Sequence, residues 1–198
     1  MQRCPHCGIA HPTVEPLHSD PLSTIGRNSG KRYEIQTLYC TSCGQPIVSF
    51  REFYMEHGSK RTYDIRLLPV AEQASSDLPE KVRSFISQAL ASMHAPDGAG
   101  MLAASAIDAM LKTKGLTKGS LHERIEKAHA DGLLIDELAE WAHEVRVVAN
   151  SIRHADVETA PLTPEQAKES VEFAVQLGEL WFGMPARIQR RRQTPEPS

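Results

Sequence analysis

Four cysteines in two pairs constrain the fold of this chain more than any other feature. They lie in the segments CPHC and CTSC, and the candidate ligands are Cys4, Cys7, Cys40 and Cys43. A gap of two residues lets both thiolates of a pair face one ion, and two pairs supply the four soft ligands that suit tetrahedral zinc. Gly8 and Gly44 follow the pairs and permit a tight turn with positive φ. We therefore predict one structural zinc ion bound by the four cysteines.

Two other interpretations of the cysteines stay open. Iron in a rubredoxin-like site would use similar knuckles, and two disulfides would use the same four residues. The N-terminal segment MQRCPHCG lacks the charged and then apolar pattern of a signal peptide. We therefore expect a cytoplasmic protein, in which disulfides are rare. His6 lies inside the first pair, and we expect it to be exposed or outside the ligand shell because four thiolates already close the site.

The first 70 residues have the pattern of a small β domain. Residues 33–40, 45–55 and 60–69 are rich in β-branched and aromatic residues, alternate in polarity and are separated by turn signals. Residues 11–31 are rich in Pro, Ser and Gly, and we interpret them as a loop. The sequence predicts a zinc ribbon with an added β-hairpin over residues 1–70. Such a domain buries little apolar surface, so the metal should contribute much of its stability.

From Asp77 onward the pattern is helical. We predict helices over residues 77–93, 95–115, 117–132, 133–155 and 163–183, the first capped by Asp77. The last should begin at Thr163, with Gln166 completing a capping box. Small residues in the second helix permit close packing, so we place that helix at the centre. The fold class is therefore α+β, a small β zinc ribbon followed by an all-α bundle of about five helices over residues 77–183.

The last segment, residues 184–198, is basic and shows no periodic apolar stripe, so we expect a mobile tail. Its candidate nucleic-acid-binding residues are Arg187, Arg190, Arg191 and Arg192. They could contact phosphates, or they could simply be solvated. The net charge of -3 argues against nucleic-acid binding by the whole surface, but it leaves room for a local basic patch. No apolar run approaches the length of a membrane span, so we expect no membrane partner.

The fourth helix carries two contrasting faces. The stripe that we assign to the core consists of Leu134, Leu138, Trp141, Val145, Val148 and Ile152. The second face, roughly opposite, carries His143, Arg146, Asn150 and His154, with Ala139 and Val147 among them. This face is either solvated or a partly buried polar interface, and its lack of Lys and Glu favours the interface. Asp108 on the second helix could pair with Arg146 or another buried base, or it could be exposed.

Three segments occur in an order that resembles a known family. They are AASAIDAML, SLHERIEKAHADGLL and RVVANSIRH. With them, residues 78–190 resemble the bacterial domain-of-unknown-function family 4145, which is placed within the HEPN superfamily (higher eukaryotes and prokaryotes nucleotide-binding). The resemblance implies a helical bundle that forms a homodimer through the Arg/Asn/His helix, and relatives often carry an N-terminal zinc ribbon.

The resemblance also implies a chemistry, because catalytic members of the superfamily cut RNA without a metal ion. The catalytic candidates are Arg146, Asn150 and His154. His154 would take part in proton transfer at the ribose 2′-hydroxyl, Arg146 would stabilise charge on the scissile phosphate, and Asn150 would position them. Active members usually have Arg directly before the polar residue that precedes His by four, and here that position is Ala149.

Two classes of function follow. Ala149 favours the first, a dimerising interaction or regulatory protein linked to RNA, DNA or a protein partner, for example in defence against phage. The alternative is a metal-independent, toxin-like endoribonuclease that uses the Arg/Asn/His helix. The sequence offers no glycine-rich phosphate loop with its lysine and no HExxH motif for other chemistry.

Overall fold

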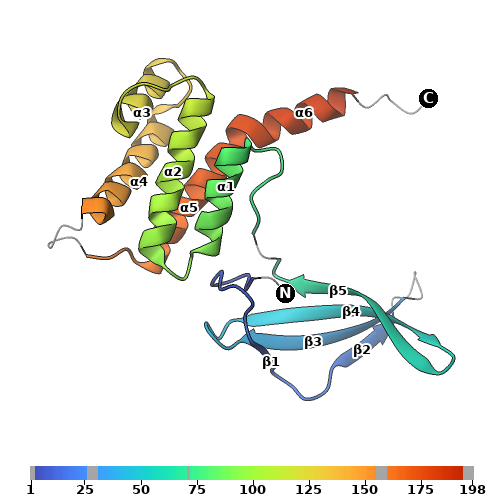
Figure 1. Cartoon of the computed structure of the whole chain (residues 1–198). Coiled ribbons are helices and arrows are strands. Elements are labelled where there is room, and N and C mark those ends of the chain that lie inside the picture. The colour runs from blue at the N-terminus through green and yellow to red at the C-terminus, as the bar shows by residue number, and fades with distance from the viewer. Residues whose placement is uncertain (1–2, 26–30, 71, 155–159, 194–198) are drawn as a thin grey trace. The chain divides into compact units, whose positions relative to one another are not determined.

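The computed structural model describes residues 3–25, 31–70, 72–154 and 160–193 (Figure 1). The chain divides into two compact units, Met1–Glu72 and Gln73–Ser198. The first unit contains a β-sheet and the second consists of helices, so the α+β class is confirmed. No helix in the described part of the chain is long and apolar enough to cross a membrane.

The sheet of the first unit is antiparallel and is built around two long strands. Its members are β1 (Val14–Pro16), β2 (Leu22–Ile25), β3 (Arg32–Cys40), β4 (Pro46–Glu56) and β5 (Ser59–Leu68). β3 pairs with β4, and β4 pairs with β5. The other edge of β3 is shared, because β1 pairs with its C-terminal end and β2 with its N-terminal end. β3 therefore delivers Cys40 to a position between β1 and β4.

The strands β1 and β2 correct our interpretation of residues 11–31 as a loop. Although this segment is rich in proline and serine, it contains two short strands that pair with the edge of β3. Proline is tolerated there because an edge strand leaves some of its amide positions unpaired. Pro16, for example, is the last residue of β1.

The buried core of the first unit is small. Among the described hydrophobic residues, Cys4, Cys40 and Ile47 are buried, and half-buried side chains such as Val14 and Leu38 pack around them. Two of the three buried residues are cysteines, so the core is centred on the cysteine group. A unit with so little buried apolar surface needs a further source of stability.

The second unit is a bundle of helices. Its elements are α1 (Glu80–Ala91), α2 (Pro96–Thr113), α3 (Leu121–Ala130), α4 (Asp136–His154), α5 (Pro164–Gly178), the π-helical turn η1 (Glu179–Gly183) and α6 (Met184–Gln193). α2 packs against α1, α4 and α5, as Figure 1 shows for its neighbours α1 and α4. Its buried face includes Ala99, Gly100, Ala103 and Ala106, which allow these close approaches. The central place predicted for this helix is confirmed.

Local sequence signals account for the first residues of α3 and α5, but the cap that we predicted for the first helix is absent. Thr163 and Gln166 form the predicted capping box at α5, and Ser120 and Glu123 form another at α3. The predicted cap of the first helix is wrong, because Pro79 precedes α1 and makes no side-chain cap. Asp77 instead accepts hydrogen bonds from both terminal nitrogens of Arg190, at 2.5 and 2.7 Å. The carboxylate that we predicted to cap the helix therefore binds Arg190, which lies far away in the sequence.

The buried face of α4 is rotated from the one predicted. Its buried residues are Ala139, Ala142, Val145 and Ala149, whereas Leu138, Trp141, Val148 and Ile152 are half-buried. Ala139, which we placed on the polar face, therefore belongs to the core, and Val147 is 53% exposed. Alanine weighs little in a hydrophobic stripe, so the larger side chains dominated the prediction. The rotation brings Arg146 closer to the core than we expected.

Residues 184–193 form the helix α6, where we expected a mobile tail. Pro185 has no amide hydrogen, so the carbonyl of Trp181 four residues earlier cannot form the usual helical hydrogen bond. The π-helical turn η1 precedes this position, and the ammonium of Lys114 donates to the freed Trp181 carbonyl at 3.3 Å. The chain thus continues as a helix past a proline that would otherwise end it. Residues 194–198 of the predicted tail lie outside the described residues.

Candidate metal centre and basic groove

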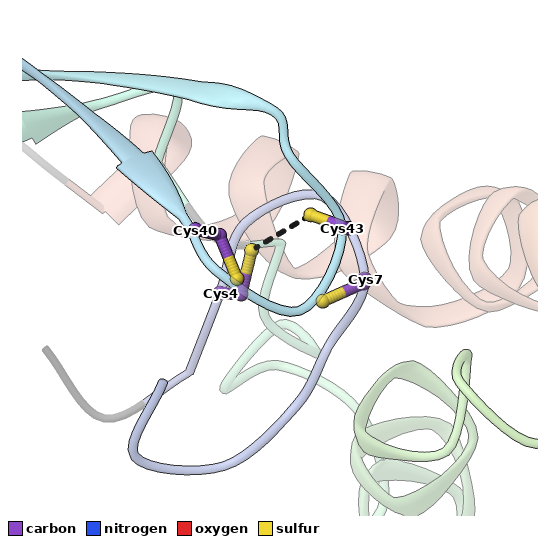
Figure 2. A group of neighbouring side chains, drawn as sticks. All are labelled: Cys4, Cys7, Cys40 and Cys43. Carbon is purple, nitrogen blue, oxygen red and sulfur yellow. Dashed lines mark hydrogen bonds between the residues drawn. The ribbon is translucent and has the colours of Figure 1, made fainter. Parts of the chain in front are cut away.

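The four cysteines lie together at one end of the sheet. Cys40 is the last residue of β3, Cys43 lies in the turn to β4, and Cys4 and Cys7 lie in the loop before β1. Figure 2 shows the four side chains directed toward a common centre. Their sulfur atoms all lie within 4.8 Å of one another. The structure thus gathers the four predicted ligands.

The sulfur positions suit a bound ion and not a disulfide. All four cysteines are free, and the Sγ atoms of Cys4 and Cys43 are 3.9 Å apart. A disulfide requires a separation of about 2.05 Å. A metal ion about 2.3 Å from each of four sulfurs in a tetrahedron would place them about 3.8 Å apart. The observed separation matches this tetrahedral edge.

The two cysteine turns have the same backbone pattern. The amides of Gly8 and Gly44 donate to the carbonyls of Cys4 and Cys40, at 3.1 and 2.7 Å. Both glycines have the positive φ that we predicted, 70° and 71°. Such turns direct backbone amides toward the sulfurs, and the amide of His6 lies 3.5 Å from the Cys4 sulfur. His6 itself is exposed and its Nε2 lies 2.9 Å from the carbonyl oxygen of Pro46.

Metal coordination requires thiolates, and the thiols of this group differ in pKa. Burial raises the pKa of Cys7 to about 12, and the Ile9 amide opposes this effect. Burial acts to raise the pKa of Cys40 as well. Hydrogen bonds from the amides of Cys43 and Ser42 outweigh this effect, so the pKa is lowered to about 7. Several buried thiolates repel one another unless a cation compensates them, and a metal ion deprotonates the thiols that coordinate it. The residues present therefore fit a metal ion.

A groove of about 830 Å³ lies on the helical unit. Residues of α1, α2, α3 and α4 line it, and its charged side chains are Lys81, Asp108, Lys112, Arg124, Arg146 and Arg153. Asp108 is the sole acid among these lining residues, so the groove is basic although the whole chain is slightly acidic. Such a local excess of positive charge attracts anionic ligands.

The helix α4 contributes Arg146, Asn150 and Arg153 to the groove, whereas His154 is not among the lining residues. Residues of an α-helix follow one another at about 100°, so positions seven apart differ by only about 20°. Positions eight apart differ by about 80°. Arg153 therefore shares the direction of Arg146, and His154 turns away and is exposed at the end of the helix. Two of the three predicted catalytic side chains come together in the groove.

Asp108 pairs with a buried base other than Arg146. It accepts hydrogen bonds on Oδ1 from Nε and Nη2 of Arg124, at 2.8 and 2.5 Å, and its Oδ2 contacts Lys112 at 2.6 Å. Arg124 is buried and also donates to the carbonyl of Gly119. The pair joins α2 to the start of α3 and forms one wall of the groove.

Arg146 is not satisfied in this way. Its Nε is buried and has no hydrogen-bond partner among the described residues. A buried donor without a partner costs free energy, so such groups are normally paired. Arg146 also lines the groove, so the groove contains a guanidinium whose hydrogen bonding is incomplete.

The arginines of the predicted tail have divided roles in α6. Arg187 pairs with Glu179 at 2.5 Å and Arg190 pairs with Asp77, so both are engaged within the helical unit. Arg191 and Arg192 are exposed and form no ion pair with any described residue. The four side chains therefore do not act alike toward a phosphate.

Several residues that line the groove, including Lys81, Lys112 and His122, were not among the predicted site residues. A signal for Arg124 was present, because this base lies on the same helical stripe as Leu121, Ile125 and Ala128. A base on an apolar stripe needs a buried acid. The pattern did not show that the acid is Asp108, since that pairing depends on how α2 and α3 pack.

The chain thus combines a β-sheet unit, whose four cysteines could bind a metal ion, with a helical bundle that carries a basic groove. The chain belongs to the family described as Domain of unknown function (DUF4145), whose profile matches residues 86–193. This range covers most of the helical unit, including the groove segments of α2, α3 and α4. Neither a curated protein nor a solved structure matches the chain.

Proposed function

We propose that this protein is a zinc-binding interaction or regulatory protein whose helical unit binds the phosphate backbone of RNA in the basic groove. The observation that carries the proposal is the buried Nε of Arg146, which lacks a partner among the described residues in a groove lined by further bases. A guanidinium binds two phosphate oxygens with a fixed geometry, so a phosphodiester is a fitting ligand.

Zinc is the proposed ion of the cysteine site. Four thiolates in two knuckles form a closed tetrahedral structural site, which leaves no position for a substrate. Because the core of the first unit is centred on these cysteines, the ion would supply much of its folding free energy.

The helical unit is proposed to be HEPN-like and to form a homodimer through α4, as the resemblance of residues 78–190 implies. The exposed Val147, Asn150 and His154 leave α4 with a mixed apolar and polar surface that a second copy could cover. A dimer would bring two basic grooves into one assembly and lengthen the backbone that it can bind. The proposed link to phage defence rests on the family resemblance, and a cytoplasmic location is proposed with it.

A binding role is favoured over cleavage for two reasons. The position that carries Arg in active superfamily members is Ala149, which is buried. In addition, His154 does not line the groove that holds Arg146 and Asn150. Within one protomer, His154, the candidate for proton transfer, therefore does not share the groove with Arg146, the candidate for phosphate binding.

The test is fluorescence anisotropy with a labelled single-stranded RNA, and a DNA of the same sequence as a comparison. Loss of one charge-assisted contact costs about 1.5–3 kcal/mol, so Arg146→Gln should weaken binding about tenfold or more. It should also make the slope of the logarithm of the binding constant against the logarithm of the salt concentration shallower by about 0.7. The matched control is Lys168→Gln, which removes an exposed base on α5 outside the groove. Equal binding by the parent and Arg146→Gln would refute the proposal, and preference for DNA would change the ligand.

The second candidate is the metal-independent endoribonuclease. One observation favours it: His154 is exposed at the end of α4, next to the groove residue Arg153, where the groove of a second copy could reach it. RNA turnover that His154→Ala abolishes without a change in melting temperature would support this candidate. Growth arrest on expression, relieved by the same substitution, would support it in the cell.

A further inference from the structure

A second group of potential metal ligands lies on the helical unit, apart from the cysteines. His122 and Glu126 are one turn apart on α3, and His143 faces them from α4. One ligand atom of each residue lies within 4.8 Å of those of the other two. The spacing of four residues puts the two α3 side chains on one face of the helix. Two helices thus present three donors of the kinds that bind divalent transition metals.

The distances within the group fit a coordination centre. The Nδ1 atoms of His122 and His143 are 3.4 Å apart. Two imidazole nitrogens, each about 2.0–2.1 Å from a tetrahedral ion, would be about 3.3–3.4 Å apart. The Nε2 of His143 lies 2.7 Å from Oε1 of Glu126. A carboxylate on the second nitrogen of a histidine fixes its orientation and makes it a better ligand.

The local structure holds these groups in place. The capping box of Ser120 and Glu123 begins α3 next to His122 and occupies the Glu123 carboxylate with the Ser120 amide and hydroxyl. Glu126 and His143 thereby have no competition from the neighbouring acid. Glu126 is 57% exposed and His143 is 23% exposed, so an ion can enter from solvent.

We propose that His122, Glu126 and His143 form a second metal site, which takes a divalent transition-metal cation such as Zn²⁺ and keeps a coordination position open toward the groove. His122 also lines the groove, so a bound ion would lie beside the basic side chains proposed to bind an anion. Sites with three protein ligands or fewer retain such an open position, in contrast to a closed four-cysteine site. The inference does not depend on RNA binding, because the ion is held by the imidazoles of His122 and His143, with Glu126 orienting the ring of His143.

The alternative is a hydrogen-bonded chain without a metal ion. One histidine nitrogen would donate to the other, and Nε2 of His143 would donate to Glu126. The same coordinates allow both states, since the proton positions depend on the tautomers. Metal affinity distinguishes them.

The experiment is a titration of the full-length, tag-free protein with Zn²⁺ by isothermal calorimetry, after the cysteine site has been filled with one equivalent. We expect a second equivalent to bind. His122→Gln and His143→Gln should each weaken that binding by about 100-fold or more, since loss of a group that only orients a ligand already costs 10–100-fold. Glu126→Gln should weaken it within that smaller range.

The matched control is His129→Gln. His129 also lies on α3 and pairs with an acid, Asp136, at 2.6 Å, but it lies outside the group of three. The His129→Gln variant should bind the second equivalent of Zn²⁺ as the parent protein does. A parent that binds no second equivalent would overturn the inference, and so would a second equivalent that survives both His122→Gln and His143→Gln. Circular dichroism of each variant confirms that a loss of binding is not a loss of folding.

Discussion

Removing the carboxylate of Asp108 should destabilise the helical unit strongly. In Asp108→Ala, the buried guanidinium of Arg124 loses both hydrogen bonds to Oδ1 and keeps the carbonyl of Gly119. Breaking a buried ion pair from one side costs about 3–5 kcal/mol. The side chain of Asp108 is 22% exposed, so water can partly replace it, and we take the lower end of this range, about 3 kcal/mol. Lys112 also loses a partner, but that exposed pair contributes only about 0.3–0.5 kcal/mol.

The assay is thermal and urea unfolding followed by far-ultraviolet circular dichroism, which reports mainly on the helices. A loss of 1 kcal/mol lowers the melting temperature by about 2–4 °C in chains of this length. Asp108→Ala should therefore melt about 6–12 °C below the parent. Lys112→Met is the control, because it removes the exposed partner and leaves Arg124 paired; it should change the melting temperature by less than about 2 °C.

A double variant separates the cost of an unpaired charge from the cost of lost packing. Asp108→Leu together with Arg124→Met removes both charges and retains apolar volume, so it should be more stable than Asp108→Ala. Two results would refute the reasoning. One is a loss below about 1 kcal/mol in Asp108→Ala, and the other is a double variant that is no more stable than this single one.

Three further predictions concern the metal, the assembly and α6. The purified protein should hold about one zinc per chain under reducing, chelator-free conditions, and Cys40→Ser should lose it while the helical unit stays folded; less than half an equivalent, or iron instead, would contradict this. Light scattering should give about twice the chain mass of 21.9 kDa, and a monomer at tens of micromolar would remove the basis for a dimer. Hydrogen bonds from Arg190 lower the pKa of Asp77, so the pair stabilises the attachment of α6 at neutral pH and weakens as the pH falls below the ordinary value of 3.8. Asp77→Asn should therefore speed tryptic cleavage within α6 at neutral pH, whereas the control Glu80→Gln should not.

Local signals in the sequence were sufficient for the cysteine site and for several helix ends. The Cys-x-x-Cys spacing and the following glycines determine the shape of each turn within a few residues, and the structure has both turns as predicted. The capping box at Thr163 is likewise contained in four consecutive residues. The small residues of α2 indicated its central position because their effect on packing does not depend on the identity of the neighbouring helix.

Features that depend on distant partners could not be predicted in this way. Asp77 had the position of a helix cap, but Arg190 binds it from the other end of the unit. Asp108 was recognised as an acid in need of a partner, but the choice of Arg124 depends on how α2 meets α3. The face of α4 was misplaced because its buried centre consists of alanines, which carry a weak hydrophobic signal. His122 and His143 lie on different helices, so no spacing along the chain relates them.

The repeat of Arg146 and Arg153 along α4 limits how this segment can change in evolution. Because the two guanidinium groups are one heptad apart, they share a direction only while seven residues separate them. One inserted or deleted residue between them would rotate the second by about 100° and remove it from the groove. Homologues that keep the groove should therefore vary in length in the loops beside α4 and keep the length of the helix between these positions. In an alignment of such homologues, gaps should therefore fall in the loops beside α4 and not between positions 146 and 153.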